Sequence, residues 1–224
     1  LGDDIVRKFD ENGLKYRLER VDFPTGVVQV TLDENKVPSY NIKEGVAWDN
    51  IPMTPELETL ASNCRAVCFG SLAQRSSVSR ATINAFVDLM PEDSLKIFDI
   101  NLRQHYFNEE IVCNSMNKAD ILKINDEEII VVAEMLNITG KSQKEICEVL
   151  LDRFALKMVI LTCGDKGSYV LTAQESSWVD TPKVNVVSTV GAGDSFTGTF
   201  IASILLGKTI RQAHEAAVRV SAYV

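Results

Sequence analysis

The sequence is poor in residues that would mark several other classes of protein. It has only two histidines among 224 residues, and its five cysteines include no Cys-x-x-Cys pair. Neither a zinc site nor a disulfide framework is therefore expected. The most apolar run, 196–206, is too short to cross a bilayer, and the first residues form neither a basic stretch nor an apolar segment. These features predict a cytoplasmic protein without a membrane partner.

Basic residues are also in deficit. The 23 Lys and Arg residues against 31 Asp and Glu residues give a formal charge of −8, which repels the phosphate backbone of a nucleic acid. No nucleic-acid partner is therefore expected. A nucleotide can still bind to an acidic protein where backbone N–H groups converge on its phosphates, so local motifs decide the question.

The hydrophobic pattern changes along the chain. Residues 14–42 are strand-like around a turn-rich segment at 33–38, which predicts an antiparallel hairpin. After residue 54, short apolar strands alternate with helical stretches, which predicts a mostly parallel sheet covered on both faces. The expected strands are 66–69, 95–98, 119–124 and 158–161, and the expected helices are 76–90, 127–137, 142–154, 194–207 and one beginning at 210.

The most informative stretch is Gly191-Ala192-Gly193-Asp194, which precedes an apolar helix. Its two glycines allow a sharp turn in which backbone N–H groups converge, and the helix adds its positive end. Asp194 then places a carboxylate beside an anion site, where it can accept the proton of an alcohol. A glycine turn also serves dinucleotide sites, but Phe196 stands where that fingerprint has its third glycine, and no P-loop pattern occurs.

Gly191 to Asp194, followed by Ser195-Phe196, resembles the C-terminal signature of the pfkB-type carbohydrate kinases, the ribokinase and fructokinase family. The resemblance implies a ribokinase-like three-layer α/β/α sandwich with a small β-sheet lid. It also implies that ATP is the phosphoryl donor and that Asp194 is the catalytic base in contact with the substrate. The anion hole implied by the motif comprises Gly191, Ala192 and Gly193.

Asn125 and Glu128 resemble the Asn-x-x-Glu motif of the same family, which organises Mg²⁺ and its waters near the ATP phosphates. The resemblance thus makes both residues metal contacts and Asn125 a nucleotide contact as well. Hard oxygen ligands suit magnesium. The alternative, from the residues alone, is a helix start at which Asn125 is the cap and acidic residues face the helix dipole. Both roles can hold together.

Two further segments resemble motifs of the family. Thr162, Gly164 and Gly167 match its nucleotide-binding Thr-x-Gly-x-x-Gly loop, for which the alternative is a plain hairpin turn. Asp99 and Arg103 match its Asp-x-Asn-x-Arg segment at the substrate edge of the active site. The carboxyl end of a strand suits that position, because ligands of open α/β sheets bind there. The alternative for this segment is an ion pair between the two side chains.

Residues 14–48 resemble the family's β lid, which excludes water from the sugar and often pairs two subunits, so a homodimer is expected. Residues 1–13 and 49–224 would form the kinase body. The family pattern is longer at both ends, so we expect this sequence to be a fragment. Ser188 stands where many members have an aspartate that helps to bind a monovalent cation, which leaves potassium activation open.

The function expected from these features is transfer of the ATP γ-phosphoryl group to a primary hydroxyl of a small sugar, with fructose as the leading choice. Two alternatives remain. One is a kinase for ribose, a nucleoside or another small alcohol. The other is a non-catalytic homologue that binds a sugar or a nucleotide.

Overall fold

The computed structural model describes residues 1–32, 38–184 and 190–223, and the chain divides into two compact units. The first unit comprises Leu1–Ala61 and Ala73–Leu89, and the second comprises Ser62–Leu72 and Met90–Val224. The division into a lid of residues 14–48 and a body formed by the rest stays a prediction. No helix in the described residues has the length and apolar character needed to cross a membrane.

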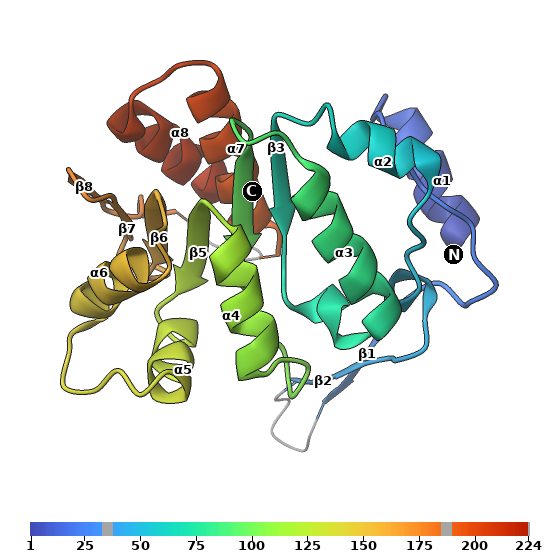
Figure 1. The fold of residues 1–224 in the computed structure, drawn as a ribbon, viewed down its shortest axis with the longest axis horizontal. Helices are drawn as coiled ribbons and strands as arrows, with labels where there is room; N and C mark the ends of the chain where they lie inside the picture. The colour runs from blue at the N-terminus through green and yellow to red at the C-terminus, as the bar shows by residue number, and fades with distance from the viewer. Residues whose placement is uncertain (33–37, 185–189, 224) are drawn as a thin grey trace. The chain divides into compact units, whose positions relative to one another are not determined.

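The first unit contains a β-hairpin and several helices (Figure 1). Its elements are α1 (Gly2–Glu11), β1 (Val28–Leu32), β2 (Pro38–Ile42), the short 3₁₀ helix η1 (Ala47–Asp49), α2 (Pro55–Ala61) and α3 (Ser77–Leu89). β1 and β2 pair antiparallel, which confirms the expected hairpin. The expectation of strand structure for residues 14–27 is wrong, because the ladder begins only at Val28. An extended segment becomes a strand only where a neighbouring backbone pairs with it.

Arg75 anchors the base of this hairpin. Its guanidinium group forms a buried ion pair with Asp49 at 2.8 Å and donates to the backbone carbonyls of Ile42 and Lys43. The same group lies over the ring of Trp48, 4.1 Å from the ring centroid. A cation over an indole ring is attracted to its electron-rich face. These contacts tie the end of β2 to η1.

The second unit is built on a six-stranded sheet in the order β3-β4-β5-β6-β7-β8. The parallel strands are β3 (Ala66–Phe69), β4 (Leu95–Asp99), β5 (Ile121–Asn125) and β6 (Met158–Thr162), and the antiparallel ones are β7 (Ser168–Leu171) and β8 (Ser176–Val179). The helices are α4 (Glu109–Lys118), α5 (Glu128–Met135), α6 (Gln143–Arg153), α7 (Ala192–Leu205) and α8 (Ile210–Tyr223). The strands and helices expected for this unit are confirmed to within a few residues at their ends.

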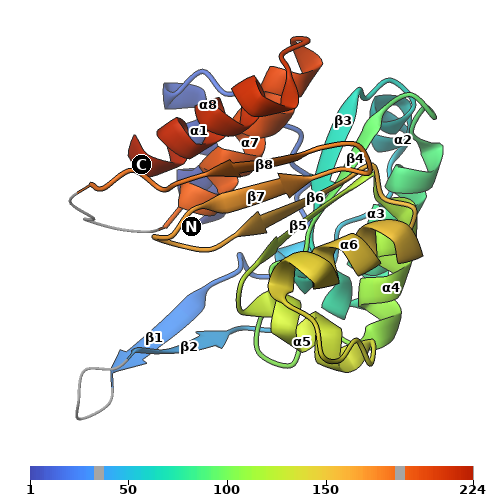
Figure 2. The ribbon, with the colours of Figure 1, turned by 90° about the vertical axis from the view of Figure 1, so that its left-hand side faces the viewer.

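Neighbouring side chains of each central strand point to opposite faces of the sheet. Phe98 and Leu122 belong to a buried cluster with side chains of α4, α5 and α6. Ile97 and Ile121 belong to a second cluster, which includes Phe200 of α7 and side chains of α8. Figure 2 shows α4 to α6 on one side of the sheet and α7 and α8 on the other. This three-layer arrangement confirms the expected fold class.

His214 of α8 is completely buried in the second unit. Its two ring nitrogens lie 2.8 Å from the hydroxyl of Ser168 on β7 and 3.0 Å from the hydroxyl of Ser177 on β8. Burial lowers the pKa of His214 to about 4, and the nearby charge of Arg211 adds to this. The neutral imidazole is thus the form that belongs to the folded core.

Candidate active site

Three neighbouring strands end in polar residues that the sequence analysis assigned to the site. Asp99, Asn125 and Thr162 are the last residues of β4, β5 and β6. Asn125 lies opposite Thr162 in the sheet register, and Asp99 lies opposite Lys123. The carboxyl edge of a parallel sheet is the usual place for a ligand in an open α/β fold. The structure therefore brings these predicted residues to the edge where a nucleotide or sugar is expected.

The glycine turn forms the start of α7. Gly191 is the N-cap, and its φ of 89° is a conformation that favours glycine. The amide of Ser195 donates to the Gly191 carbonyl at 2.8 Å, which closes the first turn. The first N–H groups of a helix find no acceptor within it, so this turn presents donors to an anion.

Asp194 lies in that first turn, and it is exposed. Within the described residues, its carboxylate makes no hydrogen bond or ion pair. The side chain of the predicted base is therefore open to solvent instead of being buried in the protein interior. A carboxylate in this position is available to take a proton from a bound alcohol.

A buried network joins α7 to the sheet. The Lys123 ammonium group lies 2.8 Å from Oδ2 of Asp99, and the Thr197 hydroxyl lies 3.0 Å from the same oxygen. The Thr197 hydroxyl is also 2.9 Å from the carbonyl oxygen of Gly193. Neither Lys123 nor Thr197 belongs to a motif found in the sequence. The available signal was a charged residue inside an apolar strand and a hydroxyl one turn after the glycine motif.

The pKa of Cys68 on β3 responds to the charges at this edge of the sheet. Burial of the thiol raises the pKa of Cys68 to about 11, although part of the residue remains exposed. The negative charges of Asp99 and Asp194 add to this rise, and Lys123 opposes it. Asp194 follows Gly193, which lies beside Lys123, and it precedes by one turn Thr197, which donates to Asp99, so its turn of α7 adjoins the Asp99 network.

Asn125 and Glu128 cap the start of α5. The Asn125 side-chain oxygen accepts from the amides of Glu127 and Glu128 at 2.9 and 2.8 Å. The Glu128 carboxylate accepts from the amide of Asn125 at 3.1 Å and from that of Leu102 at 2.9 Å. Burial raises the pKa of Glu128, and these two hydrogen bonds oppose the rise. The reciprocal pattern is a capping box and supports the capping alternative.

The magnesium role of Asn125 and Glu128 stays a prediction. Each carboxylate oxygen of Glu128 accepts one backbone N–H group and keeps a further lone pair, which can accept from the waters around a magnesium ion. No group of three His, Cys, Asp or Glu side chains that could hold a metal occurs in the part of the chain that the structure describes.

The Thr-x-Gly-x-x-Gly segment is the turn between β6 and β7. The amide of Cys163 donates to the carbonyl of Gly167 at 2.8 Å, and Gly164 and Gly167 have positive φ values of 55° and 143°. The antiparallel pairing of β6 with β7 confirms the hairpin as the local structure. The nucleotide-binding role of Thr162, Gly164 and Gly167 stays a prediction.

Replacement of Gly167 by alanine is expected to lower the free energy of unfolding by about 2 kcal/mol, since the new side chain adds both backbone strain and overlap. A Cβ atom there would lie 2.5 Å from the Trp178 ring and 2.6 Å from the Val179 carbonyl oxygen. Gly164→Ala is the matched control, because nothing lies within 4 Å of a Cβ at that position. Urea unfolding should show the larger loss for Gly167→Ala, and equal losses would contradict this account.

The family model for pfkB family carbohydrate kinases matches residues 1–224, the whole length of the chain. The chain belongs to this family. Members of the pfkB family are ATP-dependent carbohydrate kinases.

Three relatives illustrate the range of the pfkB family. An ATP-dependent 6-phosphofructokinase of Thermoanaerobacterium thermosaccharolyticum is 29% identical over 100% of this chain and 69% of its own length. A fructokinase of Rhizobium leguminosarum biovar trifolii is 24% identical over 87% of this chain and 59% of its own length. The crystal structure of aminoimidazole riboside kinase from Salmonella enterica, complexed with aminoimidazole riboside and an ATP analogue, has a TM-score of 0.77 at 21% identity and covers 99% of this chain and 74% of that one.

Asp99 and Arg103 do not form the ion pair that was the alternative for this segment. Asp99 pairs with Lys123 of the neighbouring strand, and the Arg103 guanidinium donates to the carbonyl of Leu102 at 2.9 Å. The expected substrate contacts of Asp99 and Arg103, which the pfkB-type motif implies, stay predictions. Ser188, the position relevant to a monovalent cation, lies outside the described residues.

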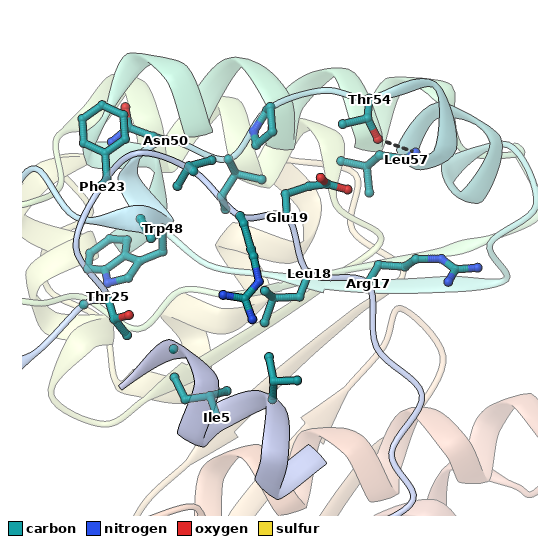
Figure 3. Close-up of a pocket in the computed structure, with 18 of the residues that line it drawn as sticks. Ile5, Arg17, Leu18, Glu19, Phe23, Thr25, Trp48, Asn50, Thr54 and Leu57 are labelled. Carbon is teal, nitrogen blue, oxygen red and sulfur yellow. Dashed lines mark hydrogen bonds between the residues drawn. The ribbon is translucent and has the colours of Figure 1, made fainter. Parts of the chain in front are cut away.

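A separate cavity of about 540 Å³ lies in the first unit. Its lining comes from α1 and from residues 17–26 and 47–57, and Figure 3 shows the apolar side chains of Ile5, Leu18 and Trp48 around it. None of the residues of the pfkB motifs lines this cavity. Because the motif residues all belong to the second unit, we place the candidate active site there.

Proposed function

We propose that this chain transfers the γ-phosphoryl group of ATP to a primary hydroxyl of a small sugar, with Asp194 as the base. The observation that carries the proposal is the exposed Asp194 carboxylate in the first turn of α7. It stands beside the N–H groups of residues 192–194 and one turn before Thr197, whose hydroxyl donates to Asp99 at the end of β4. A base and an anion site are the two elements that phosphoryl transfer to an alcohol requires.

In this mechanism the Asp194 carboxylate accepts the proton of the sugar hydroxyl as its oxygen attacks the γ-phosphorus atom. A new oxygen–phosphorus bond forms, the bond from the γ-phosphorus to the bridging oxygen breaks, and ADP leaves with the electron pair. The turn formed by Gly191, Ala192 and Gly193 donates backbone N–H groups to the charge that spreads over the transferring phosphoryl oxygens.

The proposed nucleotide contacts lie at the ends of β5 and β6. They comprise Asn125, Thr162, Gly164 and Gly167, of which Asn125 and Thr162 are paired in the sheet register. Magnesium, when bound with ATP, neutralises phosphate charge. Asn125 and Glu128 are its proposed contacts by resemblance to the family, and we assign no step of the reaction to them.

Fructose is the proposed acceptor because a fructokinase is among the relatives, and Asp99 and Arg103 are its proposed contacts. Two other relatives, a 6-phosphofructokinase and an aminoimidazole riboside kinase, are named for different acceptors. The phosphoryl-transfer apparatus proposed here would serve any of these acceptors. The choice among them therefore belongs to experiment.

We also propose that the chain is cytoplasmic and forms a homodimer through residues 14–48. Val28, Val30 and Tyr40 lie on one face of the hairpin and are 53%, 55% and 56% exposed. An apolar strand face open to water favours association with another chain. Sedimentation of the purified chain should give the mass of a dimer, and Val30→Asp should shift it towards the monomer. A monomeric wild-type chain at micromolar concentration would argue against the dimer.

The function is tested by incubating the purified chain with Mg-ATP and one acceptor at a time. The panel contains fructose, fructose 6-phosphate, ribose and a nucleoside, and release of ADP is measured with and without each acceptor. We expect acceptor-dependent release for at least one member, with fructose fastest. A different best acceptor would change the proposed substrate but not the proposed reaction. No acceptor-dependent release from a folded chain that binds ATP would reject the kinase in favour of a non-catalytic binding protein.

A further inference from the structure

Lys123 is a buried cation among the apolar residues of β5. Ile121, Leu122 and Ile124 around it are at most 2% exposed, and the Lys123 side chain is 9% exposed. Taking an ammonium group out of water costs several kcal/mol, and a single ion pair restores only part of this. The ion pair with Asp99 therefore does not by itself explain why a lysine occupies this position.

The ammonium group of Lys123 lies against the glycine turn. A Cβ atom built on Gly193 would be 3.6 Å from Nζ of Lys123, so the charge lies on the side of Gly193 where a side chain would project. Asp99 holds Lys123 on one side and accepts from Thr197 on the other. Thr197 in turn contacts the Gly193 carbonyl. One carboxylate thus fixes both the lysine and the first turn of the helix.

Two sources of positive potential meet at this place. They are the unpaired N–H groups that form the positive end of α7 and the Lys123 charge, which Asp99 partly offsets. A buried charge is screened less by salt than a surface charge, and its field is stronger than in water. An anion that binds to the N–H groups of residues 192–194 would therefore also be attracted by the charge of Lys123.

We propose that Lys123 is a positioning residue for the terminal phosphoryl group of ATP, and that Asp99 and Thr197 hold it in place. The inference rests on the proposed function, because it takes the nucleotide's terminal phosphate as the anion at α7. The backbone N–H groups contact the phosphate, and the lysine charge acts on it through the turn. Lys123 itself is not among the proposed contacts of the acceptor sugar.

The test compares two nucleotides on the whole chain by calorimetry, in the presence of Mg²⁺ and without acceptor. One nucleotide is the ATP analogue with an imido bridge between its β- and γ-phosphorus atoms, and the other is ADP. For Lys123→Met we expect about a tenfold loss of affinity for the analogue and a change of less than twofold for ADP. Thr197→Val, which keeps the lysine but frees α7 from Asp99, should lose about threefold for the analogue alone.

A second variant controls for misfolding and for the charge on Asp99 that Lys123→Met leaves unpaired. The double replacement Lys123→Met with Asp99→Asn removes both charges and should unfold at nearly the wild-type temperature. If Lys123 positions the phosphate, this variant also loses about tenfold in affinity for the analogue relative to ADP. An analogue-to-ADP ratio that stays at the wild-type value would overturn the proposal, because it would show that the lysine only neutralises Asp99. That result would leave the proposed kinase function intact, since acceptor phosphorylation is measured separately.

Discussion

Asp194→Asn is expected to lower kcat about 10³-fold, because an amide cannot accept the proton of the attacking hydroxyl. The fold should not change, since Asp194 is exposed and its carboxylate makes no hydrogen bond or ion pair within the described residues. Affinity for ATP should be retained or slightly increased, because the change removes a negative charge from the proposed phosphate site. Initial rates with the best acceptor of the panel, together with calorimetric titration of ATP, provide both measurements.

A matched control for Asp194→Asn is Asp152→Asn. Asp152 is an exposed aspartate near the end of α6, which lies on the opposite face of the sheet from α7. The control removes the same charge from the same unit without touching the glycine turn, so its rate should equal that of the wild type. If Asp194→Asn kept more than a tenth of the wild-type kcat, another group would have to be the base. Equal losses in both variants would point to an effect of net charge.

Much of the fold could be predicted because local signals and tertiary structure agree. The start of α6 illustrates this, since Ser142 accepts from the amide of Glu145 while the Glu145 carboxylate accepts from the amide of Ser142. Such a capping box is visible in the sequence as a serine followed three residues later by a glutamate. The prediction of strand structure for residues 14–27 failed because their pattern resembles a strand, whereas strand structure depends on a partner that the local sequence does not specify.

The candidate site also contains residues that the sequence predicts and residues that it does not. The turn at Gly191 and Asp194 could be predicted because the glycine, the helix start and the acid are adjacent in sequence. Lys123 and Thr197 could not, since they meet only through the register of β4 with β5 and the packing of α7 on the sheet. The same register explains why the alternative ion pair between Asp99 and Arg103 does not form. A neighbouring strand supplied a closer cation than the one four residues away in the chain.

Acid is expected to destabilise the second unit through His214. The folded-state pKa of about 4 lies below the ordinary value of 6.5, so the unfolded chain binds a proton first as the pH falls. Above pH 6.5 both states are neutral and the group contributes no pH dependence. Between pH 6.5 and 4 the folded state loses about 3 kcal/mol of stability, of which about 2 kcal/mol is lost by pH 5. Urea unfolding at pH 7 and pH 5 measures this difference.

The chain itself provides the control, because His105 is its only other histidine. His105 is exposed, so His105→Gln should keep the full loss of stability between pH 7 and pH 5. His214→Gln keeps polar atoms near Ser168 and Ser177 but cannot titrate, and it should remove most of that loss even if its stability at pH 7 is lower. Glu128, whose pKa is raised by burial, is present in every variant, so its contribution is common to the comparison. If the pH dependence persisted in His214→Gln, the acid-sensitive group would lie elsewhere in the fold.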